Sequence, residues 1–344
     1  MRRGTVAYLV LLLIGATLYY ELKRATPNLR FRFDGENHQT LRKSDLVYSK
    51  KSLSESGITR LNLDACYGEV EVVKEEGLTA VTVEATVGVP KGKSFELRSY
   101  REGSTLTVGF PEGYNPDGDL IVEIGYKVRV PEPIELRLNH RYGTALLSDL
   151  KDVEIDDRFS RLELSQIGSL RGTLKNGSAT IDGVAGEVSL DSSSGELTLE
   201  NVKGTVKLTS RHSTGTELSN IDGDLIFEGK DSPLRITRVK GTTKITDSYQ
   251  SVDIEDCGTV EFTGDYGKIG IIRSPRFLLK GGNNALSSEK VKEIRVEGKY
   301  NRVSGDADFL TLSGRADNVV ATLKGADITE EGGTLSLEFP DLTL

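Results

Sequence analysis

The sequence predicts an all-β protein: a parallel β-helix of about eleven short rungs, preceded by a small antiparallel β cap and one N-terminal transmembrane helix. Three observations support this fold class. The composition, with 37 Gly, 9 Pro, one Met and no Trp in 344 residues, is typical of a turn-rich β protein. Apolar residues recur with a period near eighteen from about residue 134 onward. An uncharged run of sixteen residues lies close to the amino terminus.

The charge of the chain is unevenly distributed. The net charge is −8, yet residues 1–43 hold eight Lys or Arg against three Asp or Glu. The remainder is therefore acidic, and an acidic body disfavours nucleic acid as a partner because it repels phosphate backbones. A basic arm beside an apolar run instead favours contact with a membrane surface.

Residues 1–24 are predicted to form a membrane anchor. Segment 5–20 reads TVAYLVLLLIGATLYY, and as a helix it would span about 24 Å against a hydrocarbon core of about 30 Å. We interpret it as an uncleaved single-pass anchor. The alternative is a secretory signal peptide, with Arg2 and Arg3 as its basic start and Gly15-Ala16 as its cleavage point.

Residues 25–57 are predicted to be a basic juxtamembrane linker, and their charges bear on orientation. Arg2 and Arg3 precede the apolar run, whereas four basic residues follow it closely, at Lys23, Arg24, Arg30 and Arg32. By the positive-inside rule this count alone would place the large domain in the cytoplasm. We nevertheless expect export, because of the body of the chain described below.

Residues 58–133 predict an antiparallel β cap. Segments such as LNLDACYGEVEVV, LTAVTVEATV and LIVEIGYKVRV alternate apolar and polar residues over longer stretches and are joined by turns that contain Gly and Pro. We expect them to cover one open end of the β-helix, since an exposed terminal rung would template aggregation.

Residues 134–344 predict the β-helix, because apolar positions recur in columns. One column steps by 17, 17, 18, 19, 18 and 18 residues, through Leu150, Ile167, Val184, Val202, Ile221, Val239 and Cys257. A second column, in the first strand of each unit, contains Leu136, Val153, Gly172, Val188, Val206, Leu225, Thr243, Val260, Phe277, Ile294 and Leu310. A unit of two short strands cannot bury its apolar face alone, so stacked units are expected. The alternative is an antiparallel sandwich, but tight Asn-Gly or Asp-Gly turns are not found at every reversal.

These residues resemble the putative-adhesin domain of unknown function, a family built of β-strand repeats in bacterial envelope proteins. The resemblance rests on LNLDACYGEVEVV from Leu61, on YKVRVPEPIELRLNHRYGTALLSDL from Tyr126, and on the Gly-punctuated repeat that follows; it covers about residues 58–325. It implies an extracytoplasmic β-helical domain without an assigned biochemical role. We therefore expect a single-pass protein of the cytoplasmic (inner) membrane, with the β domain in the periplasm or at the cell surface.

Metal and phosphate sites are weakly indicated. Oxygen ligands for calcium could come from Asn115, Asp117, Asp119 and Glu123, although these residues would make a turn without metal, which we favour. Segment 88–94 is similar to a phosphate loop, but it is one residue short and precedes a predicted strand. The three histidines, His38, His140 and His212, lack metalloprotease spacing and are expected at the surface.

The two cysteines could form a disulfide in an exported protein. Cys257, however, occupies a column otherwise filled by Val, Ile and Leu. We therefore predict a buried thiol that packs as a small apolar residue.

A row of aromatic residues is the candidate interaction surface. It consists of Tyr142, Phe159, Tyr249, Tyr266 and Tyr300, which fall at or near the same turn of the repeat. Aromatic stacking within the β-helix is the simpler interpretation. The alternative is an exposed strip on which sugar rings stack.

The predicted function is that of a non-enzymatic scaffold or adhesin-like surface, without cofactors, because the turns are too short to build a catalytic cleft. Its expected partners are the membrane, through residues 5–20, and other envelope proteins or glycans. Two alternatives stay open: an accessory subunit of an integral membrane complex, and a cytoplasmic bactofilin-like scaffold that polymerises end to end.

Overall fold

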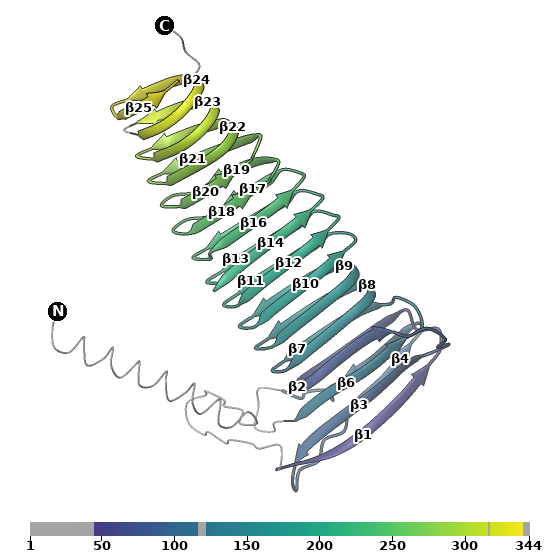
Figure 1. Cartoon of the computed structure of the whole chain (residues 1–344). Coiled ribbons are helices and arrows are strands. Elements are labelled where there is room, and N and C mark those ends of the chain that lie inside the picture. The colour runs from purple at the N-terminus through teal and green to yellow at the C-terminus, as the bar shows by residue number, and fades with distance from the viewer. Residues whose placement is uncertain (1–44, 116–121, 316, 340–344) are drawn as a thin grey trace, which may run out of the picture.

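The protein is an elongated β-solenoid (Figure 1). The structure, a computed structural model, describes residues 45–115, 122–315 and 317–339. The predicted anchor at 5–20 and His38 lie outside these residues. Within them, no helix has the length and apolar character needed to cross a membrane.

The N-terminal end contains six strands: β1 (Leu46–Glu55), β2 (Arg60–Lys74), β3 (Val81–Pro90), β4 (Arg98–Glu102), β5 (Thr105–Gly109) and β6 (Glu123–Val130). The pairs β1–β3, β3–β6 and β4–β5 are antiparallel. The prediction of antiparallel strands ahead of the solenoid is therefore confirmed. β5 and β6 pair with the two halves of β2, so this assembly extends both sides of the first solenoid turn.

β2 differs from the prediction, because its partners in the solenoid are parallel. Leu61 lies opposite Leu136 in β7 (Glu135–Arg141), and Val70 lies opposite Ala145 in β8 (Thr144–Arg158). β2 is thus a rung of the solenoid rather than part of an antiparallel cap. The sequence hid this role because strands β3 to β6 separate β2 from its next rung.

Each later turn supplies two strands, one to each side of the solenoid. Strands β9 (Arg161–Lys175), β22 (Ala285–Lys299), β23 (Arg302–Arg315) and β24 (Asn318–Glu331) run through a corner and serve both sides, as β8 does. The first sheet also contains β11 (Val188–Ser193), β13 (Val206–Arg211), β15 (Leu225–Lys230), β17 (Thr243–Thr246), β19 (Thr259–Thr263) and β21 (Arg276–Gly282). The second sheet contains β10 (Ser178–Val184), β12 (Glu196–Val202), β14 (Gly215–Ile221), β16 (Leu234–Val239), β18 (Ser251–Glu255), β20 (Lys268–Ile272) and β25 (Thr334–Glu338). The solenoid has about 12 turns, against about eleven expected.

The register confirms the apolar columns. Val188 lies opposite Val206, and Val206 opposite Leu225, so identical positions of successive turns stack directly. One assignment is wrong: the residue between Val153 and Val188 is Leu170, not Gly172. This turn is 17 residues long where the assignment required 19, and Gly172 lies opposite Ile155 instead.

Two corners per turn allow the chain to reverse. At both corners a residue adopts positive φ, mostly near 55°, and it is usually not glycine. At the corner that leads from the first sheet to the second, a glycine often follows this residue, and the backbone of the preceding turn comes very close to it. A Cβ on Gly195, for example, would lie 1.9 Å from the carbonyl oxygen of Gly177. Side-chain volume at this position therefore opposes the stacking of turns.

This contact predicts a position-specific loss of stability. Gly195→Ala should lower the free energy of unfolding by about 2 kcal/mol, because the methyl group forces two hydrogen-bonded turns apart. Gly215→Ala is the matched control, since a Cβ there meets no atom within 4 Å. Urea denaturation of the full chain, followed by circular dichroism, measures both. Equal loss in the two variants would contradict the role of the close approach.

Candidate functional site

One buried cluster has the residue types of a hydrolase site. His140 Nδ1 lies 2.8 Å from Asp157 Oδ1, and Ser160 Oγ donates to Asp157 Oδ2. The hydroxyl bonds the carboxylate rather than the imidazole, so His140 is not placed to activate it as in a Ser-His-Asp triad. All three side chains are buried, with His140 fully inaccessible. The cluster is a satisfied polar patch of the interior.

His140 therefore corrects a prediction. It was expected at the surface but faces the interior, at the position where Asp157 of the next turn can satisfy its ring nitrogen. His212 is exposed, as predicted. Among the residues that the structure describes, no group of three His, Cys, Asp or Glu is arranged to hold a metal ion. Asp117 and Asp119 of the calcium candidate lie outside those residues, and Glu123 accepts a hydrogen bond from the Tyr48 hydroxyl at 3.2 Å.

The phosphate-loop candidate follows β3 into a turn and then irregular chain, without a helix in segment 88–94. Both cysteines are buried thiols. Cys257 is 3% exposed, which confirms its placement in the apolar column, and burial raises the pKa of its thiol to about 11.

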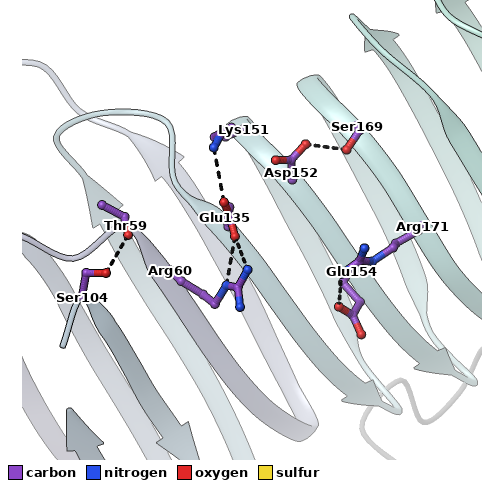
Figure 2. Close-up of polar contacts among 9 residues, drawn as sticks. All are labelled: Thr59, Arg60, Ser104, Glu135, Lys151, Asp152, Glu154, Ser169 and Arg171. Carbon is purple, nitrogen blue, oxygen red and sulfur yellow. Dashed lines mark hydrogen bonds and ion pairs between the residues drawn. The ribbon is translucent and has the colours of Figure 1, made fainter. Parts of the chain in front are cut away.

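Charged side chains on the first sheet pair between turns (Figure 2). Arg60 Nε donates to Glu135 Oε2 at 2.9 Å, and Lys151 lies 3.3 Å from the other oxygen of Glu135. Arg171 pairs with Glu154 at 2.7 Å. Hydrogen bonds from these cations lower the pKa of both Glu135 and Glu154. The charges in these columns neutralise each other, so little uncompensated charge is left to bind an external ligand.

The predicted aromatic residues share one corner, which we call the aromatic edge. It comprises the positive-φ residues between a first-sheet strand and the following second-sheet strand: Tyr67, Tyr142, Phe159, Asn176, Ser194, His212, Asp231, Tyr249, Tyr266, Asn283 and Tyr300. Their φ values run from 52° to 65°. The backbone N–H of each predicted aromatic donates to the next turn, as Phe159 does to Lys175 O at 2.8 Å. The edge is therefore fixed by the backbone ladder.

The rings form two stacks. The ring centroids of Tyr67 and Tyr142 are 4.6 Å apart, those of Tyr142 and Phe159 5.0 Å, and those of Tyr249 and Tyr266 4.9 Å. In each pair the two ring planes are nearly parallel. A bulky residue at positive φ costs about 1–2 kcal/mol, and each ring pair returns about 0.5–1.5 kcal/mol. Stacking therefore offsets the strain of the corner.

Stacking also decides what the edge presents to solvent. Phe159 is 48% exposed, Tyr249 66%, Tyr266 53% and Tyr300 57%. Within each stack the inner ring faces lie against each other, so the exposed parts are ring edges and the outer faces of the end rings. A sugar ring could lie flat against a ring face only at the end of a stack. The predicted exposed strip therefore offers few ring faces on which sugars can stack. Tyr67 escaped the sequence analysis because β3 to β6 interrupt the period after it.

A column of basic residues directly precedes the aromatic edge. One register position is occupied in successive turns by Arg141, Arg158, Lys175, Ser193, Arg211 and Lys230. Ser193 is the one uncharged member of this column. The sequence analysis missed this column. The signal was present as a basic residue immediately before the corner residue in most of these repeats.

Asp247 is a second buried charge, inside the solenoid near Tyr249. Its Oδ1 accepts from the Ser248 N–H at 2.5 Å, whereas Oδ2 has no hydrogen-bond partner. Its carboxylate fills the space above Gly229, where a Cβ would lie 1.7 Å from Oδ2. Burial, and to a smaller degree Asp231, raise the pKa of Asp247 to about 7.

This pKa predicts a pH-dependent effect of substitution. Because the folded-state pKa of about 7 exceeds the ordinary value of 3.8, the carboxyl lowers stability progressively as the pH rises from about 4 to about 7. Asp247→Asn should raise the free energy of unfolding by about 2 kcal/mol at pH 8 and leave it nearly unchanged at pH 4. Thermal unfolding at the two pH values measures this, with exposed Asp253→Asn as control. A gain of equal size at both pH values would contradict the assignment.

No protein-family model and no curated protein matches the sequence. Solved structures similar to the chain include a "putative cell adhesion protein" from Clostridium sporogenes, with 10% identity over 61% of this chain and 99% of that chain and a TM-score of 0.24. A "putative adhesin" from Parabacteroides merdae shares 15% identity over 82% of this chain and 95% of that chain, with a TM-score of 0.25. A "putative adhesin" from Bacteroides fragilis shares 11% identity over 71% and 96%, with a TM-score of 0.26.

The resemblance predicted from the sequence is thus matched by solved structures of putative adhesins over most of the chain, at low identity. TM-scores of 0.24 to 0.26 supply no argument for a function.

Proposed function

We propose that this protein is a non-enzymatic scaffold or adhesin-like surface, anchored in the cytoplasmic membrane by residues 5–20 and presented outside it. The observation that carries the proposal is the aromatic edge, where two stacks of rings and the exposed Tyr300 are held along one corner by the backbone of successive turns. Such a row suits broad contact with an extended partner, because its residues are positioned before binding and lose little freedom.

The geometry also favours a surface over an active site. The corners of the solenoid are only a few residues long. Side chains of the kinds that act in catalysis, such as His140 and Asp157, are buried and bonded to each other. End-to-end polymerisation is less favoured, because β3 to β6 extend both sheets beyond the first turn and occupy that end. An accessory subunit of a membrane complex is the remaining alternative and is an outcome of the test below.

The proposal predicts membrane attachment with an external β domain. The full chain with a carboxyl-terminal tag should sediment with membranes, and a membrane-impermeant protease should digest the β domain in intact spheroplasts. A variant carrying Leu11→Arg and Leu13→Arg is the control and should leave the membrane pellet, because charges at the centre of the apolar run oppose insertion. Protection of the β domain until the cells are lysed would contradict the proposed orientation.

Purification of the tagged chain in mild detergent separates the two remaining functions. A monomer, or a chain that carries only envelope glycans, supports the exposed surface. Co-purification of integral membrane proteins at fixed stoichiometry would replace it with the accessory-subunit function.

A further inference from the structure

The basic column beside the aromatic edge is unusual among the charged columns of this solenoid. Arg141 lies opposite Arg158, Arg158 opposite Lys175, Ser193 opposite Arg211, and Arg211 opposite Lys230. Successive turns are about 4.8 Å apart. The column is therefore a row of like charges that runs parallel to the solenoid axis, on a chain whose net charge is −8.

Like charges that face each other across strands are unfavourable, and several charged positions of the solenoid pair opposite signs instead. Lys244 pairs with Glu261, Arg276 with Glu293, and Lys280 with Glu297 of the next turn. These exposed pairs alternate in sign between turns. Like charges also face each other at single positions, such as Glu135 opposite Asp152 and Lys299 opposite Arg315, whereas the basic column continues over several turns.

Three cations of the basic column have no counter-charge close by in the described part of the chain. Arg158 Nε lies 3.6 Å from Asp156 Oδ1. In the described part of the chain, no carboxylate lies within 4.0 Å of the charged groups of Lys175, Arg211 or Lys230. Glu228 precedes Lys230 by two residues on the same face without forming an ion pair with it. Three cations are therefore available to an external anion.

The opposite corner provides an internal comparison, because its backbone has the same conformation. There the side chains bond each other between turns: Asn201 donates to Asp182 at 2.6 Å, Asn220 to Asn201 at 3.0 Å, and Arg238 to Asn220 at 2.5 Å. Arg273 pairs with Asp256 at 2.6 Å. That corner satisfies itself, whereas the aromatic edge and the basic column do not.

The neighbouring side chains suit an anion that also carries hydroxyl groups. Ring edges bear partial positive charge, and the stacked rings expose their edges along both stacks. Between the two stacks, the edge presents Asn176, Ser194 and His212, all exposed and able to hydrogen-bond a sugar hydroxyl. Asp231 beside His212 is the one acidic residue in this stretch of the edge, and it lies 3.4 Å from His212 Nδ1.

We propose that the basic column and the aromatic edge together bind a linear anionic polysaccharide that lies along the solenoid axis, with its acidic groups facing Lys175, Arg211 and Lys230. This ligand class rests on the proposed function as an interaction surface. A polymer with widely spaced charges fits better than nucleic acid. A single row of cations, one turn of about 4.8 Å apart at the closest and interrupted by Ser193, matches few of the charges that duplex DNA places every 1.7 Å or so. The acidic remainder of the chain would repel the other phosphates.

The test uses the full chain in mild detergent and polygalacturonate oligomers as the probe. A variant carrying Lys175→Glu, Arg211→Glu and Lys230→Glu should bind the oligomer about tenfold more weakly or worse, because three attractions become repulsions. The matched control carries Lys203→Glu, Lys207→Glu and Arg235→Glu, which make the same change of net charge at exposed positions away from the edge. It should retain most of the affinity. Replacement of the first three residues by Gln tests the same point if the Glu variant fails to fold.

Other ligands define the outcomes that overturn the proposal. Uncharged dextran should not bind, and affinity for polygalacturonate should fall as salt is raised. Absence of polygalacturonate binding, or equal loss in the two triple variants, would overturn the site. Equal or tighter binding of single-stranded DNA would overturn the ligand class. None of these results bears on the protease and co-purification experiments, so a failure here is distinguishable from a failure of the proposed function.

Discussion

The structure depends on one constraint: successive turns must stay in parallel register so that each backbone N–H meets a carbonyl of the next turn. The register pairs Val188 with Val206 and Val206 with Leu225, and it continues along both sheets. Turn length can vary by a residue or two only where the corners absorb the difference. The positive-φ residues and the adjacent glycines do this, since Gly195 allows the backbone of Gly177 to approach more closely than any side chain would permit.

Register converts sequence position into surface pattern, because residues of equal position stack into columns. An apolar column becomes a continuous core, and an aromatic column becomes a stack, as at Tyr142 and Phe159. A charged column is stable when its signs alternate, as at Arg137, Glu154 and Arg171, of which Figure 2 shows the last two. The same rule makes a column of one sign conspicuous, and it concentrates positive charge along a line rather than in a patch.

The sequence was sufficient to predict these columns but not all of their members. Val188, Val206 and Leu225 were placed correctly because apolar spacing reports register directly. Leu170 was missed in favour of Gly172 because turn length varies, and a single sequence does not say which turn is short. β2 and Tyr67 were missed because the strands that follow them interrupt the period. His140 was expected outside because polarity alone says nothing of a buried partner such as Asp157 on the next turn.

The two corners of the solenoid differ in how far their side chains satisfy one another's polar groups. Both impose positive φ on non-glycine residues, so backbone strain cannot distinguish them. At one corner Asn and Arg side chains close a chain of hydrogen bonds between turns, through Asn201, Asn220 and Arg238. At the other, rings cover each other's faces but leave their edges in solvent, and the adjoining cations Lys175, Arg211 and Lys230 have no carboxylate within ion-pairing distance in the described chain. A corner that satisfies its own polar groups needs no partner. The corner with unpaired charge gains from one, and the solenoid fixes the spacing at which that partner must offer its charges.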